Sequence, residues 1–226
     1  MILFGDYHTH TIYSRKRHAS GTVLENALVA QQKGLKEIAI TDHGFNHRFF
    51  SVKRKKWDNL FEDVENAKKE TNVNILLGIE SNLISMDGDI DLTEEEKLSM
   101  DIILMGYHNC TKAKTCRDAG SLFVKNHFSQ ACGYCKRQIE KNTTAYLKAM
   151  EKNRIDVITH LNYGMKVNTL EVAKMARDTE TYIELNGKRI LFSDDEMVRM
   201  AEIGVKFIVD SDAHCSTNVG ECNNAL

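Results

Sequence analysis

Short apolar runs alternate along the chain with longer segments whose apolar residues recur at helical spacing. The runs are rich in Ile, Leu and Val, and each is short enough to be a single strand. Alternating strands and helices are typical of βα units and of a parallel sheet. The pattern predicts seven strands, at residues 2–6, 37–41, 74–79, 101–106, 155–159, 181–185 and 205–209.

Helices are predicted in the segments that separate these strands, at residues 22–33, 57–70, 139–152, 169–177 and 194–203. No linker, repeat or low-complexity tract divides the chain, so we expect residues 1–226 to form one domain. One long stretch, 107–137, has no regular pattern, is basic and holds four of the six cysteines. We expect it to be an insertion or a lid on the same domain.

Polar residues collect directly after the predicted strands. They are His8 and His10 after the first strand, Asp42 and His43 after the second, Glu80 after the third, His108 after the fourth, His160 after the fifth, the segment NGKR after the sixth, and the segment SDAH, which holds Asp212 and His214, after the seventh. In a parallel α/β barrel the carboxyl ends of all strands share one face, where active sites are built. Such a fold would bring these residues together.

The histidines among these residues favour a metal centre. His8 and His10 are two positions apart, so in a strand both rings point to the same side and can reach one ion. A single histidine beside a strand is more often a hydrogen-bonded structural residue than a ligand. However, seven of the nine histidines lie at strand ends or in the loop after the first strand, whereas unrelated structural histidines would scatter. His47 and His127 lack this placement, and we assign them no metal.

Composition narrows the classes of partner. With 226 residues, of which 42% are hydrophobic and 27% charged, the chain can form one soluble domain with a full core. Its net charge of −2 gives no electrostatic reason to expect a nucleic acid partner, and no apolar run reaches the roughly 20 residues that span a membrane. The apolar start of the chain is too short for a signal peptide, so we expect a cytoplasmic protein with reduced cysteines.

The segments DYHTHTIYS, HASGT, ITDHG, GIE, GYH, ITH and SDAH occur in this order over nearly the whole chain. This series resembles the motifs of the PHP (polymerase and histidinol phosphatase) family, and its spacing is most similar to that of the small bacterial PHP phosphatases. The resemblance implies a distorted (β/α)7 barrel with a trinuclear metal site. It also implies three ligand groups, which are His8, His10, Glu80 and Asp212 at one ion, His18, His43 and His214 at a second, and Glu80, His108 and His160 at a third, with Glu80 as a bridge.

Two features depart from that family. Leu161 stands where many members have a proline, and the sequence ends at residue 226, soon after His214, where members usually carry a further helix. The second departure leaves open whether the barrel closes.

The expected ligands indicate the chemistry. Imidazoles and carboxylates without thiolates suit zinc, manganese or iron. Closely spaced ions can hold a bridging hydroxide at neutral pH, which would attack the phosphorus of an ester while the ions offset charge on the phosphoryl oxygens. The sequence thus predicts an enzyme that hydrolyses a small phosphate monoester, such as histidinol phosphate or a similar metabolite, with three divalent ions as cofactors.

A basic residue is expected to hold the phosphate. Two groups are placed to do so, namely Arg15, Lys16 and Arg17 before His18, and Lys188 and Arg189 after the sixth strand. We interpret at least two of the three residues in the first group as solvated surface charges. Asp42, next to His43, is expected to orient a ligand or transfer a proton, although a structural role in a turn fits almost as well.

Four of the cysteines could form a structural metal site, and two other classes of function remain open. Cys110, Cys116, Cys132 and Cys135 have the spacing C-x5-C-x15-C-x2-C, which is compatible with a structural zinc site, but we favour reduced, unliganded thiols.

An amidohydrolase-type deaminase or amidase also opens with a His-x-His strand, yet it does not require the additional His18 and His43. A non-catalytic, regulatory PHP domain is the third possibility, and the full ligand set argues against it.

Overall fold

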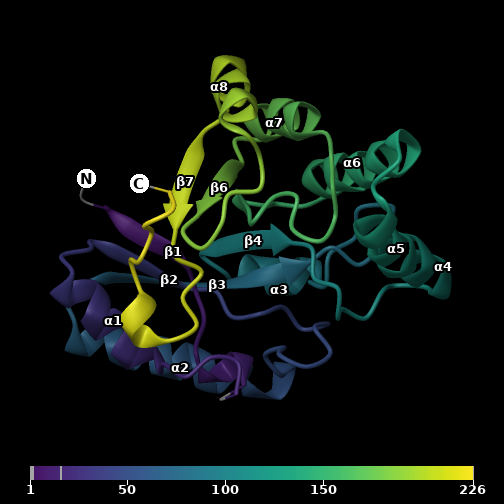
Figure 1. The fold of residues 1–226 in the computed structure, drawn as a ribbon. Coiled ribbons are helices and arrows are strands. Elements are labelled where there is room, and N and C mark those ends of the chain that lie inside the picture. Colours follow the sequence, from purple (N-terminus) through teal and green to yellow (C-terminus); the bar gives the residue numbers. More distant parts are fainter. Residues whose placement is uncertain (1–2, 16, 226) are drawn as a thin grey trace.

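The computed structural model describes residues 3–15 and 17–225. Its seven strands form one parallel sheet in which each strand pairs with the next along the chain, in the order β1 to β7 (Figure 1). The strands are β1 (Gly5–Thr9), β2 (Glu37–Ile40), β3 (Asn74–Asn82), β4 (Ile102–Gly106), β5 (Val157–Ile158), β6 (Tyr182–Asn186) and β7 (Phe207–Asp210).

The first and last strands meet and almost close the sheet into a barrel. Thr9 and Ala213 form a parallel bridge. The backbone N–H of His10 donates to the carbonyl of Ala213 at 2.8 Å, and the N–H of Ala213 donates to the carbonyl of His8 at 3.2 Å. The predicted distorted (β/α)7 barrel is therefore confirmed.

Helices follow most of the strands and cover the outside of the barrel. They are α1 (Val23–Gln32), α2 (Trp57–Glu70), α3 (Glu94–Leu98), α4 (Cys116–Asp118), α5 (Lys125–Cys132), α6 (Lys136–Lys152), α7 (Thr169–Asp178) and α8 (Asp194–Ile203). Helices α1, α3 and α8 each begin with a capping box, in which a Thr or Ser side chain and a Glu three residues later satisfy each other's backbone N–H groups. No helix in the described residues is both long and apolar enough to cross a bilayer.

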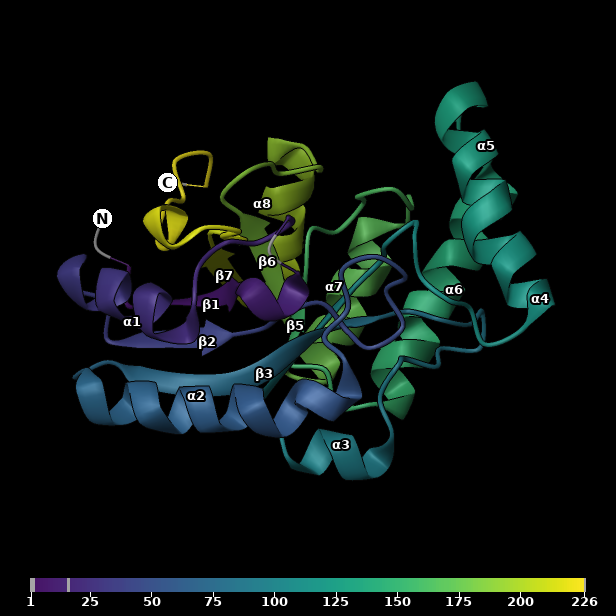
Figure 2. The same ribbon diagram turned by 90° about the horizontal axis from the view of Figure 1, so that it is seen from below.

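The structure corrects two of the predicted elements. The first strand was expected at 2–6, but it spans Gly5–Thr9, so that His8 lies inside it; Phe4, part of the apolar run that suggested the earlier start, is exposed. Residue 2 lies outside the described residues. The stretch 107–137 was expected to be irregular, but it contains α4, a π-helical segment at Ala119–Val124 and α5. Figure 2 shows α4 and α5 at the end of the molecule, away from α1. That the whole chain is one domain stays a prediction.

The barrel interior is apolar in its middle and polar toward the carboxyl ends of the strands. Glu80 pairs in register with Leu104, and Leu104 with Val157, so the three side chains share the inner face of the sheet. Leu104 and Val157 belong to a small buried cluster inside the barrel, whereas the larger apolar clusters include the buried faces of the surrounding helices. Glu80 therefore lies next to apolar side chains on the inner face of the sheet.

Gly106 leaves room for the side chains of His160 and Glu80. Gly106 ends β4, and a Cβ atom at this position would lie 2.5 Å from Oγ1 of Thr159, 2.7 Å from Cε1 of His160 and 3.2 Å from Oε1 of Glu80. Such contacts are too close for any other residue to be accommodated without moving the neighbours. Gly106 thus allows His160 and Glu80 to approach each other.

Candidate metal centre

A cavity of about 390 Å³ opens where the strands end. Seven of the nine predicted metal ligands and two of the predicted phosphate-binding residues line it, namely His18, His43, Glu80, His108, His160, Asp212, His214, Lys188 and Arg189. The remaining two predicted ligands, His8 and His10, are fully buried and contact this set. The structure therefore brings all nine predicted ligands into one site.

The carboxylate of Glu80, near the end of β3, is the common point of the site. It is fully buried. Five histidine nitrogens surround it, with Nε2 of His160, His108 and His8 at 2.7, 3.2 and 3.4 Å from its Oε1, and Nδ1 of His43 and Nε2 of His10 at 2.7 and 3.8 Å from its Oε2. Burial raises the pKa of Glu80, but the positive charges of His108 and the other neighbouring rings outweigh burial and hold the pKa well below its usual value.

A first group of ligand atoms consists of His8, His10 and Asp212. The Nε2 atoms of the two rings are 3.1 Å apart, and Oδ1 of Asp212 lies 3.4 Å from Nε2 of His10 and 3.8 Å from Nε2 of His8. Burial lowers the pKa of His8, but the carboxylates of Glu184, Glu80 and Asp212 outweigh burial and hold it well above its usual value. The surroundings thus favour positive charge at this position, which a divalent cation would also supply.

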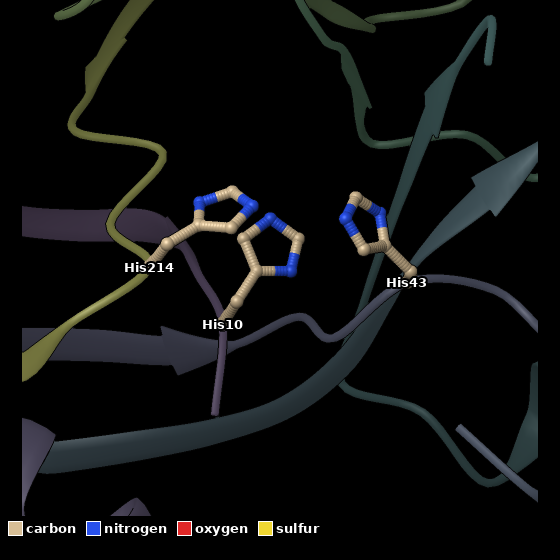
Figure 3. A group of neighbouring side chains, drawn as sticks. All are labelled: His10, His43 and His214. Atoms are coloured by element: carbon tan, nitrogen blue, oxygen red, sulfur yellow. The ribbon is translucent and has the colours of Figure 1, made fainter. Parts of the chain in front are cut away.

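A second group consists of His18, His43 and His214. Nε2 of His18 lies 2.8 Å from Nε2 of His43 and 3.0 Å from Nε2 of His214. His10 lies beside this group as well as in the first, because one nitrogen each of His10, His43 and His214 falls within 4.8 Å of the others. Figure 3 shows these three rings side by side. His10 therefore connects the two groups.

The donor atoms fit divalent metal ions. Burial lowers the pKa of His43 to about 3 and that of His18 to about 4, so both rings are neutral at pH 7 and carry a lone pair. In the second group, Nε2 of His18 faces Nε2 of His43 and Nε2 of His214. A proton on one of these three nitrogens can be shared with only one of the others at a time, so at least one lone pair lacks a partner. Oε2 of Glu80 is buried and makes no hydrogen bond in the described part of the chain, although Nδ1 of His43 lies 2.7 Å away. An ion bound by imidazole and carboxylate would satisfy these atoms.

A carboxylate that the sequence analysis did not identify orients two ligands. Glu184, on β6, lies with Oε1 2.6 Å from Nδ1 of His8, and its Oε2 accepts the backbone N–H of His160 at 2.5 Å. The bond to Nδ1 leaves Nε2 of His8 free to bind a metal. Nothing in the local sequence marks Glu184, because it lies inside a strand and becomes informative only when the barrel places it under His8.

The third group consists of Glu80, His108 and His160, and Asn82 orients one of its rings. Nδ1 of His108 donates to Oδ1 of Asn82 at 2.9 Å, which turns Nε2 of His108 toward Glu80. The backbone of His160 has a φ of 28°, a left-handed conformation that is rare outside glycine. Such conformations concentrate at functional sites, where the surrounding structure imposes them.

Asp42 lies next to the site and holds the backbone of the loop that follows β1. It is fully buried, and its carboxylate accepts hydrogen bonds from the backbone N–H of Thr11 at 2.7 Å, the hydroxyl of Thr11 at 2.6 Å and the backbone N–H of Ser14 at 3.0 Å. Ser14 in turn accepts the N–H of His43 at 3.0 Å. Asp42 is not among the residues that line the cavity. This geometry favours the structural interpretation over proton transfer.

The two groups of basic residues differ in their placement. Lys188 and Arg189 line the cavity. Nζ of Lys188 lies 3.2 Å from Oδ1 of Asp212, and the guanidinium of Arg189 lies over the ring of Tyr163 with its carbon 5.2 Å from the ring centroid. Arg15 and Arg17 are exposed and do not line the cavity, and Lys16 lies outside the described residues.

The cysteines show no metal-binding geometry. All six are free, and Cys110, Cys116, Cys132 and Cys135 are exposed. In residues 3–15 and 17–225, no cysteine belongs to a group of three or more ligand atoms close enough to share an ion. That these residues are unliganded thiols stays a prediction.

His47, to which no role was assigned from the sequence, lies at the site. Only 6% of its surface is exposed, and its ring lies 5.0 Å from that of His43 and 5.5 Å from that of His108, measured between centroids. Burial and the neighbouring charge of His108 lower its pKa to about 4. No feature of the sequence indicated a role for His47, because it follows a motif and does not stand directly after a predicted strand.

A parallel barrel that gathers imidazoles and carboxylates around a cavity at its carboxyl end defines a metal-dependent hydrolase. The chain belongs to the PHP domain family, whose model matches residues 6–191. The resemblance inferred from the sequence motifs is therefore confirmed.

Relatives and solved structures agree with this assignment. A protein of Thermoanaerobacter sp. (strain X514) named "Probable phosphatase" is 30% identical over 242 residues, which cover 100% of this chain and 85% of the relative. A protein of Vibrio parahaemolyticus with the same name is 29% identical, with 100% and 84% covered. The structure of histidinol phosphate phosphatase from Lactococcus lactis with zinc, L-histidinol and phosphate has a TM-score of 0.56 at 15% identity, covering 94% of this chain and 86% of that one. At such identity the likeness shows the fold alone.

We predict that Glu184→Gln weakens metal binding by about 10- to 100-fold, because the amide cannot accept hydrogen bonds at both positions that hold His8 and His160. Metal retained after dialysis against increasing chelator, counted by mass spectrometry, measures this. Glu202→Gln, an exposed change on α8, is the matched control. Equal retention by the two variants would contradict the role of Glu184.

Proposed function

We propose that this PHP-family phosphatase hydrolyses a small phosphate monoester, histidinol phosphate or a metabolite of similar size, with three divalent ions of zinc, manganese or iron. The observation that carries the proposal is the convergence of three ligand groups on the buried carboxylate of Glu80, at a cavity that Lys188 and Arg189 also line. The named activity of the relatives and the contents of the Lactococcus lactis structure support the same class of substrate.

The three ions would be held by three sets of residues. These are His8, His10, Glu80 and Asp212 for the first, His18, His43 and His214 for the second, and Glu80, His108 and His160 for the third. A carboxylate has two oxygens and can serve two ions, whereas an imidazole ordinarily serves one. Glu80 is therefore the bridging ligand in this proposal, because its Oε1 faces the third set and its Oε2 faces His43.

In this proposal the ions and the basic residues of the cavity have different roles in catalysis. When bound, the ions would lower the pKa of a water molecule and offset charge on the phosphoryl group. Lys188, whose Nζ lies 3.0 Å from Nδ1 of His214, is placed to bind a phosphoryl oxygen beside the ligands. The guanidinium of Arg189 offers paired N–H donors that match two oxygens of a phosphate. Both side chains would hold the substrate in place for attack.

We expect the purified protein to hydrolyse p-nitrophenyl phosphate and small phosphate monoesters, to lose this activity on chelation, and to regain it on addition of zinc, manganese or iron. The reason is that, in this proposal, the ions acidify the attacking water and offset charge on the phosphoryl group, and chelation removes both contributions. Release of inorganic phosphate, together with metal analysis of the same sample, measures this. Full turnover by a sample shown to be free of metal would refute the proposed function.

We also expect Lys188→Ala and Arg189→Ala to raise KM about tenfold or more while metal content stays unchanged, because each removes a charged hydrogen bond to phosphate but no ligand. Arg199→Ala, which removes an exposed arginine on α8, is the control. An increase in KM with Arg17→Ala, and none with the two cavity variants, would move phosphate binding to the loop before His18.

A further inference from the structure

His47 shares the cavity with the metal ligands, but its hydrogen bonds differ from theirs. Nδ1 of His47 accepts the backbone N–H of Phe50 at 3.2 Å and lies 3.4 Å from the N–H of Phe49, which it also accepts. A backbone N–H can only donate, so Nδ1 must present its lone pair to this turn. In a neutral imidazole the proton is then on Nε2.

Two of the proposed metal ligands have the opposite arrangement. Nδ1 of His8 faces Oε1 of Glu184, and Nδ1 of His108 faces Oδ1 of Asn82. Each of these oxygens accepts a hydrogen bond from Nδ1–H, which leaves the lone pair on Nε2 for an ion. His47 has neither nitrogen available, because Nδ1 is occupied by the backbone and Nε2 carries the proton.

The protonated nitrogen of His47 is open to the cavity. His47 is one of the residues that line the cavity. Its Nε2 has no acceptor within residues 3–15 and 17–225, and it is not among the buried polar atoms that lack a partner. An N–H that reaches a cavity without a protein acceptor is available to a ligand.

We infer that His47 is a substrate-binding residue, which donates its Nε2–H to a phosphoryl oxygen of the monoester and binds no metal. This inference rests on the proposed function. The ring lies close to His43 and His108, so the donor lies beside two of the ligand groups, where the phosphoryl group would be held. Phosphoryl oxygens are acceptors only, and a neutral donor adds to the charged contacts of Lys188 and Arg189.

Two substitutions separate the two nitrogens of His47. Asn reproduces the position of Nδ1 and keeps an acceptor for the backbone of Phe50, but it lacks the outer donor. Gln places an N–H near the position of Nε2. We expect zinc-loaded His47→Asn to hold as much zinc as the wild type, and its KM for p-nitrophenyl phosphate and its Ki for inorganic phosphate to rise about tenfold. His47→Gln should recover part of this loss, and His127→Asn, an exposed change on α5, is the control.

The measurements separate the possible roles of His47. Loss of a zinc equivalent in His47→Asn would make it a ligand, and a wild-type Ki for phosphate would make it purely structural; either result overturns the inference. If the wild type hydrolyses no monoester, the proposed function fails first. The comparison of phosphate binding by calorimetry between wild type and His47→Asn then decides the role of His47 independently, with a weakened affinity expected and an equal affinity contradicting it.

Discussion

The structure depends on one buried carboxylate, that of Glu80. An ionised carboxylate inside a protein is costly unless positive charge or hydrogen bonds compensate for it. At Glu80 five imidazoles from four other segments surround the carboxylate, including those of His43, His108 and His160. The ring of His43 is neutral at pH 7, because burial lowers its pKa to about 3, and a bound cation would supply the positive charge that this ring does not. The end of every strand therefore contributes either to this cluster of imidazoles and carboxylates or to its support.

That support comes from groups that fix the direction of each ring. Glu184 and Asn82 each accept a hydrogen bond from Nδ1–H of one proposed ligand and thereby direct its Nε2 inward. The backbone of Phe49 and Phe50 does the reverse for a ring in the same cavity. Two kinds of histidine thus lie side by side, one with its lone pair on Nε2 and the other with a proton there, and the difference is the partner of Nδ1.

The sequence was sufficient for the barrel and for the set of converging residues, because strand periodicity places residues after parallel strands on one face whatever the details of packing. It was insufficient for features that arise only from contacts between distant segments. Glu184 could not be distinguished from other strand residues, and the helical character of residues 119–132 depends on a π-helical segment that no pattern indicated. His47 was set aside for its position in the sequence, although the turn that follows it determines its chemistry. The short helix α3 was detectable, since Thr93 and Glu96 form a capping box.

Counting the metal bound by two variants tests the bridging role of Glu80 most directly. The ring nitrogen of His18 lies against those of His43 and His214, which belong to its own group. The carboxylate of Glu80, in contrast, contacts residues of all three groups. In folded, monodisperse samples, the account predicts that Glu80→Ala loses more than one metal equivalent per chain and His18→Ala loses about one. A Glu80→Ala protein that retains the metal content of the wild type would contradict it.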